Sequence, residues 1–165
     1  MKRGLFIGRF QPFHLGHLKD IKDALKQVDE LIIGVGSSQE KHTKENPFSV
    51  EERIEMIDYV LDAEDIGNYT IYPVPDFHDD KKWTKHIETL VPKFDIVFTG
   101  NEWTERCFKN RGYKIKKIKL IKGISSAIIR NRIFKNKDWY KLVPEKTVGY
   151  LEKIKGIERI KRVFK

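Results

Sequence analysis

The chain contains a single cysteine, Cys107, among its 165 residues. One cysteine cannot form a disulfide within the chain, so the fold must be stable without one, and a reducing compartment is favoured. Long apolar runs are also missing, because the longest, such as 31–35, are far too short to cross a membrane. The basic start of the chain leads into an apolar stretch that Arg9 interrupts, and no small-residue cleavage site follows. We therefore expect no signal peptide, no membrane association and a cytoplasmic location.

Two common nucleotide-binding signatures are absent as well. Gly34 and Gly36 are not followed by the third glycine of GxGxxG, and no GxxxxGK[ST] sequence occurs. These absences argue against a P-loop enzyme and against an ordinary dehydrogenase.

Positive charge is what the chain has in excess. Lysine and arginine number 33 against 24 acidic residues, which gives a net charge of +9. Polyanions such as RNA or nucleotide phosphates are therefore plausible partners, and charge alone does not choose between them. Much of the excess lies in 114–122 and 153–165, where charged and apolar residues alternate as on the solvated face of a strand or helix. We expect no nucleic-acid partner from these segments.

The apolar pattern predicts strands and helices in alternation. Short apolar runs predict strands at 4–8, 30–37, 69–75, 94–100 and 114–121. Helical spacing predicts helices at 18–28, 50–61, 83–90 and, more weakly, 104–108, and the pattern after 125 is helical to the end. This order predicts an α/β fold with a doubly wound parallel sheet. We expect one domain over 1–165, with an α/β core at 1–122 and C-terminal helices at 123–165.

Five polar loops follow the predicted strands. They are GRFQPFHLGH, GSSQEKHTK, PDFHDDKKW, GNEW and GISSAIIR. Ligands of such sheets bind beyond the carboxyl ends of the strands. The sequence therefore predicts a functional site along this edge.

His14 and His17 stand three residues apart where a helix is predicted to begin. Unpaired N–H groups and the helix dipole favour an anion at such a position. Gly8 allows a ligand to approach the backbone, and Pro12 and Gly16 shape the turn. Three interpretations remain open: structural caps, two ligands of a metal site, or a phosphate-binding pair. No third metal ligand follows at close spacing, although His42, His78 and His86 lie on other segments.

The segment ISSAIIR, 124–130, also offers phosphate donors where a helix is predicted to begin. Ser125 or Ser126 can cap a helix and leave hydroxyl and N–H donors for phosphate, while Arg130 presents a fork of donors. Taken alone, the same residues are an ordinary cap followed by a surface arginine.

Together these motifs resemble a known superfamily. Gly8, His14, Gly16 and His17 match the HxGH signature of the nucleotidyltransferases with a Rossmann-like fold, and ISSAIIR matches their ISSxxxR signature. The longer form GRFQPFHLGH resembles the archaeal nicotinamide-nucleotide adenylyltransferases. The resemblance covers essentially the whole chain. It departs at Ala127, where the family often has a threonine, so one hydroxyl contact is missing.

The resemblance implies transfer of AMP from ATP to nicotinamide mononucleotide (NMN), giving NAD and pyrophosphate. Mg²⁺ would bridge phosphate oxygens and need no dedicated metal ligands from the protein. The implied catalytic residues are His14, His17 and Arg130. The implied ATP contacts also include Gly8, Arg9, Phe10, Gly100, Asn101, Ser125 and Ser126. The resembling enzymes are oligomers, which implies a homo-oligomer here.

For the NMN site, the resemblance implies that Trp83 stacks on the nicotinamide ring, as suits a flat cationic heterocycle. Lys44 would meet the NMN phosphate, and Ser37, Asp76 and Phe77 are weaker candidates. The alternatives are a core tryptophan and a solvated lysine. Other acceptors, such as phosphopantetheine or FMN, are less favoured, because those relatives usually carry an acidic residue where this chain has Gln11. A basic nucleic-acid-binding protein is the alternative from another class.

Overall fold

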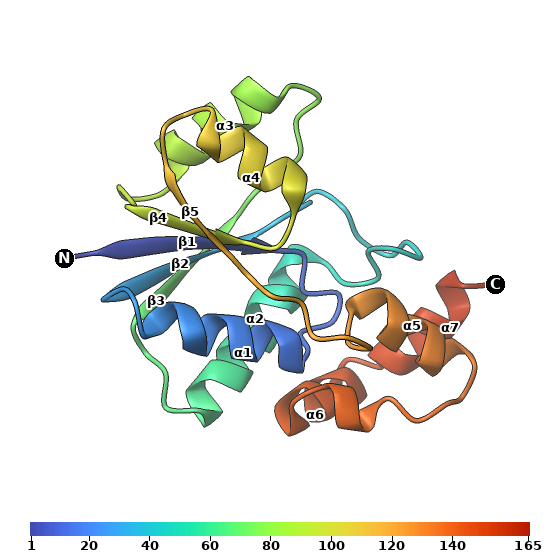
Figure 1. The fold of residues 1–165 in the computed structure, drawn as a ribbon. Helices are drawn as coiled ribbons and strands as arrows, with labels where there is room; N and C mark the ends of the chain where they lie inside the picture. Colours follow the sequence, from blue (N-terminus) through green and yellow to red (C-terminus); the bar gives the residue numbers. More distant parts are fainter.

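Five parallel strands form the centre of the fold, in the spatial order β3-β2-β1-β4-β5 (Figure 1). The computed structural model describes residues 1–165. The strands are β1 (Arg3–Gly8), β2 (Glu30–Val35), β3 (Tyr69–Pro73), β4 (Ile96–Thr99) and β5 (Lys114–Lys117). The predicted α/β fold with a parallel sheet is confirmed.

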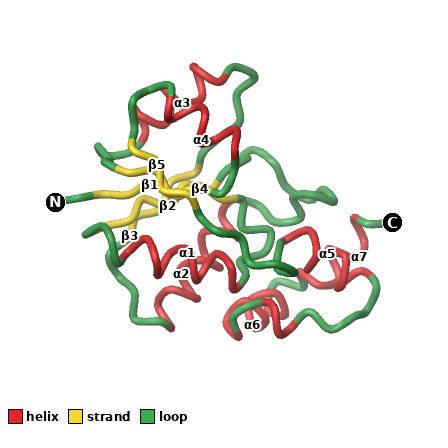
Figure 2. Tube along the Cα trace, in the orientation of Figure 1, coloured by secondary structure: helices red, strands yellow, loops and turns green.

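Helices cover both faces of this sheet. Helices α1 (Leu15–Leu25) and α2 (Val50–Ala63) lie on one face, and α3 (Asp80–Leu90) and α4 (Glu102–Lys109) lie on the other (Figures 1 and 2). Successive strand residues point to opposite faces. Accordingly, Leu5, Ile32 and Val97 join the core beneath α3 and α4, whereas Phe6, Ile33 and Phe98 join the core beneath α1 and α2.

The C-terminal helices gather near the carboxyl ends of the strands (Figure 1). They are α5 (Ser126–Phe134), a short 3₁₀ turn η1 (Tyr140–Leu142), α6 (Glu145–Lys153) and α7 (Gly156–Val163). Leu151 and Ile160 are fully buried in the core shared with α1 and α2. An ion pair of 2.6 Å between Arg159 Nη1 and Glu52 Oε1 fastens α7 to α2.

Several element ends differ from the sequence prediction. Strand β2 ends at Val35 rather than at residue 37, because the chain turns at Ser37, whose φ is 48°. Strand β5 ends at Lys117 rather than at residue 121, and the last bond to its neighbour runs from the Ile118 N–H to the Thr99 carbonyl. Helix α1 ends at Leu25, so Val28 lies beyond it. The all-helical prediction after 125 is wrong for 135–139, which link α5 to η1.

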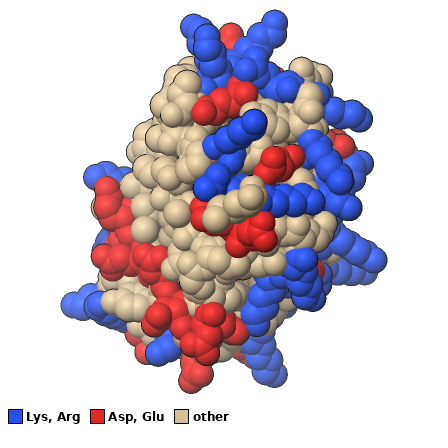
Figure 3. All heavy atoms as spheres, turned by 90° about the vertical axis from the view of Figure 1, so that its left-hand side faces the viewer, with Lys and Arg blue, Asp and Glu red and all other residues tan.

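Charged side chains are spread over the face shown in Figure 3. On the side where β1 begins, basic and acidic groups both occur, and the acidic groups lie mostly lower in the view of Figure 3. Part of the basic excess is paired within the chain: Lys117 contacts Glu105 at 3.6 Å, and Lys161 Nζ donates to Asn136 at 2.6 Å. None of the helices has the length and apolar content that a membrane span requires.

Candidate active site

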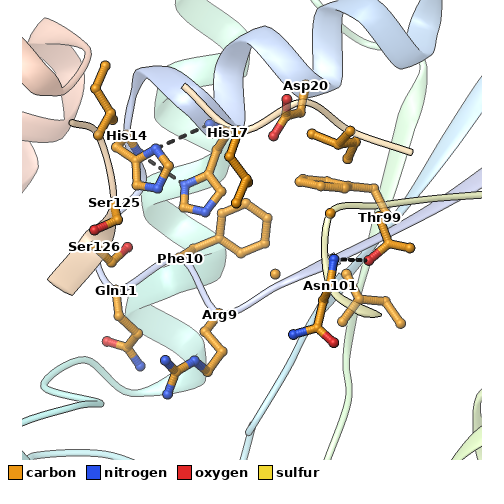
Figure 4. A pocket seen from close by; sticks show the side chains of 17 residues that line it. Arg9, Phe10, Gln11, His14, His17, Asp20, Thr99, Asn101, Ser125 and Ser126 are labelled. Carbon is orange, nitrogen blue, oxygen red and sulfur yellow. Dashed lines mark hydrogen bonds between the residues drawn. The ribbon is translucent and has the colours of Figure 1, made fainter. Parts of the chain in front are cut away.

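A cavity of about 390 Å³ opens where the strand order reverses, between the loops that follow β1 and β4. After β3 the chain crosses to the other side of β1, and such switch points are where ligands of α/β sheets bind. The N-termini of α1 and α5 also border the cavity (Figure 4). Its lining residues are Phe6, Ile7, Gly8, Arg9, Phe10, Gln11, His14, His17, Asp20, Thr99, Gly100, Asn101, Ile118, Leu120, Ile124, Ser125 and Ser126.

His14 and His17 cap the N-terminus of α1 reciprocally (Figure 4). The His17 N–H donates to His14 Nδ1 at 3.3 Å, and the His14 N–H donates to His17 Nδ1 at 3.1 Å. The two rings stack, with centroids 3.6 Å apart and planes 19° from parallel. The pair therefore acts as a capping box in which imidazole nitrogens replace the usual side-chain oxygens.

The caps fix the protonation of both rings. A nitrogen that accepts a hydrogen bond carries no proton, so in the neutral rings the proton lies on Nε2. Burial lowers the pKa of His14 to about 4, and burial together with the neighbouring His14 lowers the pKa of His17 well below its usual range. Near neutral pH both rings are neutral Nε2–H donors. No cluster of three or more His, Cys, Asp or Glu side chains is arranged to hold a metal ion.

Gly16 makes this arrangement possible. A Cβ at this position would lie 2.8 Å from His14 Cε1 and 2.9 Å from His14 Nδ1. Any side chain here would push the His14 ring away from the backbone N–H that it caps. The glycine between the two histidines is therefore required by the close approach of the His14 ring.

The N-terminus of α5 lies on the other side of the loop after β1. Ser125 Oγ accepts a bond from the Ile128 N–H at 3.1 Å, which makes Ser125 the cap of α5. Ser126 Oγ donates to the Pro12 carbonyl at 2.9 Å. The backbone N–H groups of Ser125 and Ser126 have no intrahelical partner, and both residues line the cavity, so these groups are available to an anion.

Arg130 does not line the cavity. It is 5% exposed, and its Nη1 donates to the Gln11 carbonyl at 2.9 Å, which fastens α5 to the loop after β1. Its Nε is buried without a partner. Burial and the neighbouring Arg9 lower the pKa of Arg130 to about 10, so it stays charged near neutral pH. No acidic side chain forms an ion pair with either arginine.

The remaining residues predicted for the nucleotide lie around the cavity. Arg9 is exposed, and its Nη1 donates to Asn46 Oδ1 at 3.4 Å. Phe10 is fully buried, and its ring centroid lies 4.5 Å from that of His17. Asn101 caps α4 through a bond from the Thr104 N–H, and a Cβ at Gly100 would lie 3.2 Å from the Ile118 carbonyl oxygen. With Gly8, the cavity brings together all the predicted nucleotide contacts except Arg130.

None of the five residues predicted for the second substrate lines this cavity. Trp83 is 5% exposed and packs against Trp103, with ring centroids 4.5 Å apart. Ser37 Oγ donates to Asp76 Oδ1 at 3.2 Å, which joins the loops after β2 and β3 at the same sheet edge. Lys44 Nζ lies 5.0 Å from the centroid of the Phe164 ring. Phe77 is 38% exposed beside His86.

Comparison with known proteins assigns the chain to a family. Residues 5–132 match the cytidylyltransferase-like family. The chain is 45% identical over 163 residues to a nicotinamide-nucleotide adenylyltransferase of Thermococcus sibiricus, a match that covers 96% of this chain and 88% of that protein. It is 43% identical over 166 residues to the protein of that name from Pyrococcus furiosus, covering 98% and 88%. The chain belongs to the archaeal nicotinamide-nucleotide adenylyltransferases of this family.

A solved structure shares the fold of this adenylyltransferase family member. It is a bifunctional NMN adenylyltransferase/ADP ribose pyrophosphatase from Francisella tularensis, complexed with AMP and a Mn ion. The TM-score is 0.85 at 24% identity, over 98% of this chain and 51% of the other. The present chain thus spans about half the length of that protein.

Three residues that the sequence reasoning missed lie in or around this family member's candidate site. Arg53 is fully buried in α2 and donates to the carbonyls of Arg9, Gly36 and Ser37 at 2.7 to 3.1 Å. Gln11 is 1% exposed and forms two bonds with the Phe48 backbone. Asp20 lines the cavity from α1. Its spacing of three from His17 puts it on the same helical face, which is a signal that the sequence does contain.

Proposed function

We propose that this chain transfers the adenylyl group of ATP to the 5′-phosphate of NMN and releases NAD and pyrophosphate. The NMN phosphate oxygen attacks the α-phosphorus of ATP directly and in line, without a covalent enzyme intermediate. The relatives at 45% and 43% identity carry the name of this activity.

One observation carries the proposal: the two free imidazole Nε2–H groups and the N-termini of two helices face a single cavity. Such donors bind a polyphosphate directly, so the protein need not supply side chains that coordinate a metal ion. Arg9 adds an exposed positive charge at the rim, and Arg130 adds a buried one behind the loop. We place the triphosphate of ATP between these groups.

The reaction makes modest chemical demands on the protein. A phosphate monoester such as that of NMN is largely doubly ionised near pH 7, since its second pKa is about 6, so no general base is needed to activate it. Catalysis then consists of alignment and of stabilising the charge that develops at the α-phosphate. His17 is the donor nearest that phosphate in our assignment, with His14 beside it, while Arg9 and Arg130 neutralise the departing pyrophosphate.

The substrate is ATP with its Mg²⁺ ion. The side-chain donors around the phosphate end of the cavity are N–H and O–H groups, and the only carboxylate among the lining residues is Asp20. This donor set suits a cation that is held by phosphate oxygens and water, as Mg²⁺ usually is. The ion supplies further neutralisation of the phosphates.

We assign NMN to the sheet edge beside this cavity, where the loops after β2 and β3 meet. Trp83 would stack on the nicotinamide ring and Lys44 would meet the phosphate, with Ser37, Asp76 and Phe77 as further contacts. Because Trp83 is 5% exposed beneath Trp103, this assignment requires the two indoles to separate when NMN binds. We further propose a homo-oligomer in the cytoplasm.

Incubation of the purified protein with ATP, Mg²⁺ and a panel of acceptors tests the function. NMN should yield NAD and an equal amount of pyrophosphate, with ATP preferred over CTP. Phosphopantetheine and FMN should yield no adduct. Turnover of one of those acceptors without NAD formation would assign another reaction of the family. RNA binding that survives replacement of His14 and His17, without ATP turnover, would assign a nucleic-acid-binding protein.

A further inference from the structure

Asp20 is an unpartnered carboxylate in the cavity. It lies on α1, three residues after His17, and thus on the same helical face. Figure 4 shows it on the opposite side of the cavity from Arg9 and Gln11. Lys19 Nζ pairs with Asp23 Oδ2 at 2.7 Å, so its charge acts on Asp20 only from a distance. The Asp20 side chain forms no hydrogen bond and no ion pair in the chain.

The surroundings of Asp20 are unfavourable for a carboxylate. It is the only acidic residue that lines the cavity, and Phe6, Ile118 and Leu120 supply apolar lining. Burial raises the pKa of Asp20 to about 7. A carboxylate held in such surroundings without a partner gains much from a ligand that offers a hydrogen-bond donor.

The position of the phosphate donors limits which part of a nucleotide reaches Asp20. His14, Ser125 and Ser126 belong to the two helix N-termini, where phosphates bind. Asp20 lies a further turn along α1, about 4.5 Å along the axis from His17 at 1.5 Å per residue. A nucleotide whose phosphates occupy the helix N-termini therefore extends its base toward Asp20 and the apolar lining.

We propose that the Asp20 carboxylate accepts a hydrogen bond from the 6-amino group of adenine and makes the site selective for bases that carry this donor. The inference rests on the proposed function, since it takes ATP as the nucleotide of this cavity. Above the pKa of Asp20, where the group is ionised, a 6-oxo base in the same orientation places an acceptor oxygen against the carboxylate and is disfavoured. Asp20 is thus a specificity-determining residue of the base subsite.

The test compares ATP with purine riboside triphosphate, in which hydrogen replaces the 6-amino group. At saturating NMN, the wild type should favour ATP in kcat/KM by roughly 10- to 100-fold, the range expected for a hydrogen bond to a charged group. Asp20→Val should bring the ratio close to one, mainly by raising KM for ATP. Asp20→Asn, which keeps an acceptor oxygen but no charge, should give a ratio between the two. Asp62→Val, an exposed site on α2, is the matched control and should keep the wild-type ratio.

Two results would overturn the inference. The first is equal use of the two nucleotides by the wild type, which needs no variant. The second is an Asp20→Val protein that remains active with the wild-type ratio. In both cases NAD is still formed from ATP, so the proposed function stands. Failure of the wild type to form NAD from ATP and NMN would instead overturn the proposed function.

Discussion

At the scale of single residues, the histidine pair has both a structural and a chemical role. The interpretations as caps and as phosphate donors do not exclude each other, because Nδ1 of each ring caps α1 while Nε2 remains available. Three of the four signature residues have a visible physical reason in the structure: the two rings bond to each other's backbone, and Gly16 makes room for the first ring.

Replacement of His17 should affect the chemical step more than ATP binding. A donor whose bond strengthens as charge develops acts mainly on kcat, and losing one such donor lowers kcat by roughly 100- to 1,000-fold. We expect this loss in His17→Ala, with KM for ATP changed by only a few fold, in steady-state measurements of NAD formation. Lys146→Ala, at an exposed position on α6, should leave both constants unchanged. Equal losses of kcat and of ATP affinity in His17→Ala would contradict this role.

Burial of His14 should also make the stability depend on pH. Its pKa is about 4 in the folded chain against an ordinary value of 6.5, so the unfolded chain takes up the proton first. The contribution of His14 to stability is lost as pH falls from about 6.5 and levels off near pH 4. Between pH 7.5 and 5, wild type should lose about 2 kcal/mol relative to His14→Gln in the free energy of unfolding by denaturant. A difference between the two proteins that does not change with pH would refute the burial of a neutral ring.

At the scale of elements, the loop after β1 is held by three side chains from two helices, α2 and α5. Arg53 of α2 binds the Arg9 carbonyl, Arg130 of α5 binds the Gln11 carbonyl, and Ser126 binds the Pro12 carbonyl. Neither arginine is paired with a carboxylate. Each therefore orders the loop and leaves its positive charge uncancelled near the cavity, which favours an anionic ligand.

Loss of Arg53 should weaken the fold and loosen this loop. Its guanidinium also binds the carbonyls of Gly36 and Ser37, so Arg53→Met leaves several buried or half-buried acceptors without donors. We expect the free energy of unfolding to fall by about 3 kcal/mol in chemical denaturation. Arg106→Met, at an exposed site on α4, provides the matched comparison and should cost less than about 0.5 kcal/mol. Similar stabilities for the two variants would show that the carbonyl contacts of Arg53 contribute little.

Most of the strands and helices were predictable from the sequence, and each exception has a physical reason. The strand cores and the helices between them follow from local patterns, and all are found. Residues 118–121 continue the alternation of β5 but leave the sheet, and there Ile118 and Leu120 line the cavity. Periodicity reports which side chains are apolar, not whether a neighbouring strand is present to pair with. The roles of Gln11 and Arg53 depend on contacts more than ten residues away, which no local pattern encodes.

At the scale of the whole molecule, the C-terminal helices are part of the same core as the sheet. Leu151 and Ile160 pack in the cluster that contains Phe6 and Phe98, and α7 is tied to α2 by the pair of Arg159 and Glu52. Since the N-terminus of α5 borders the cavity and α5 contacts α7, helices α6 and α7 support the site without lining it. The segment after residue 125 was predicted as helical, but the packing of α6 and α7 against α2 was not predictable from periodicity alone.

Shortening a buried side chain of α7 should therefore destabilise the entire fold. Ile160→Ala removes a fully buried side chain, which costs about 2 to 5 kcal/mol. Helix content and NAD-forming activity should be lost together at a lowered melting temperature. Ile128→Ala, where the side chain is 37% exposed, should melt close to wild type. Loss of helix signal in Ile160→Ala well before activity disappears would mean that the tail unfolds independently.

The stereochemical course at the α-phosphorus tests the central claim most directly, namely that ATP in this cavity is attacked by the NMN phosphate without a protein nucleophile. A single diastereomer of ATP that carries sulfur on the α-phosphorus is allowed to react with NMN. The configuration at the same phosphorus in the resulting NAD phosphorothioate is then assigned by phosphorus NMR. A single in-line displacement predicts inversion. Retention would require two successive displacements through a covalent enzyme intermediate and would contradict the account.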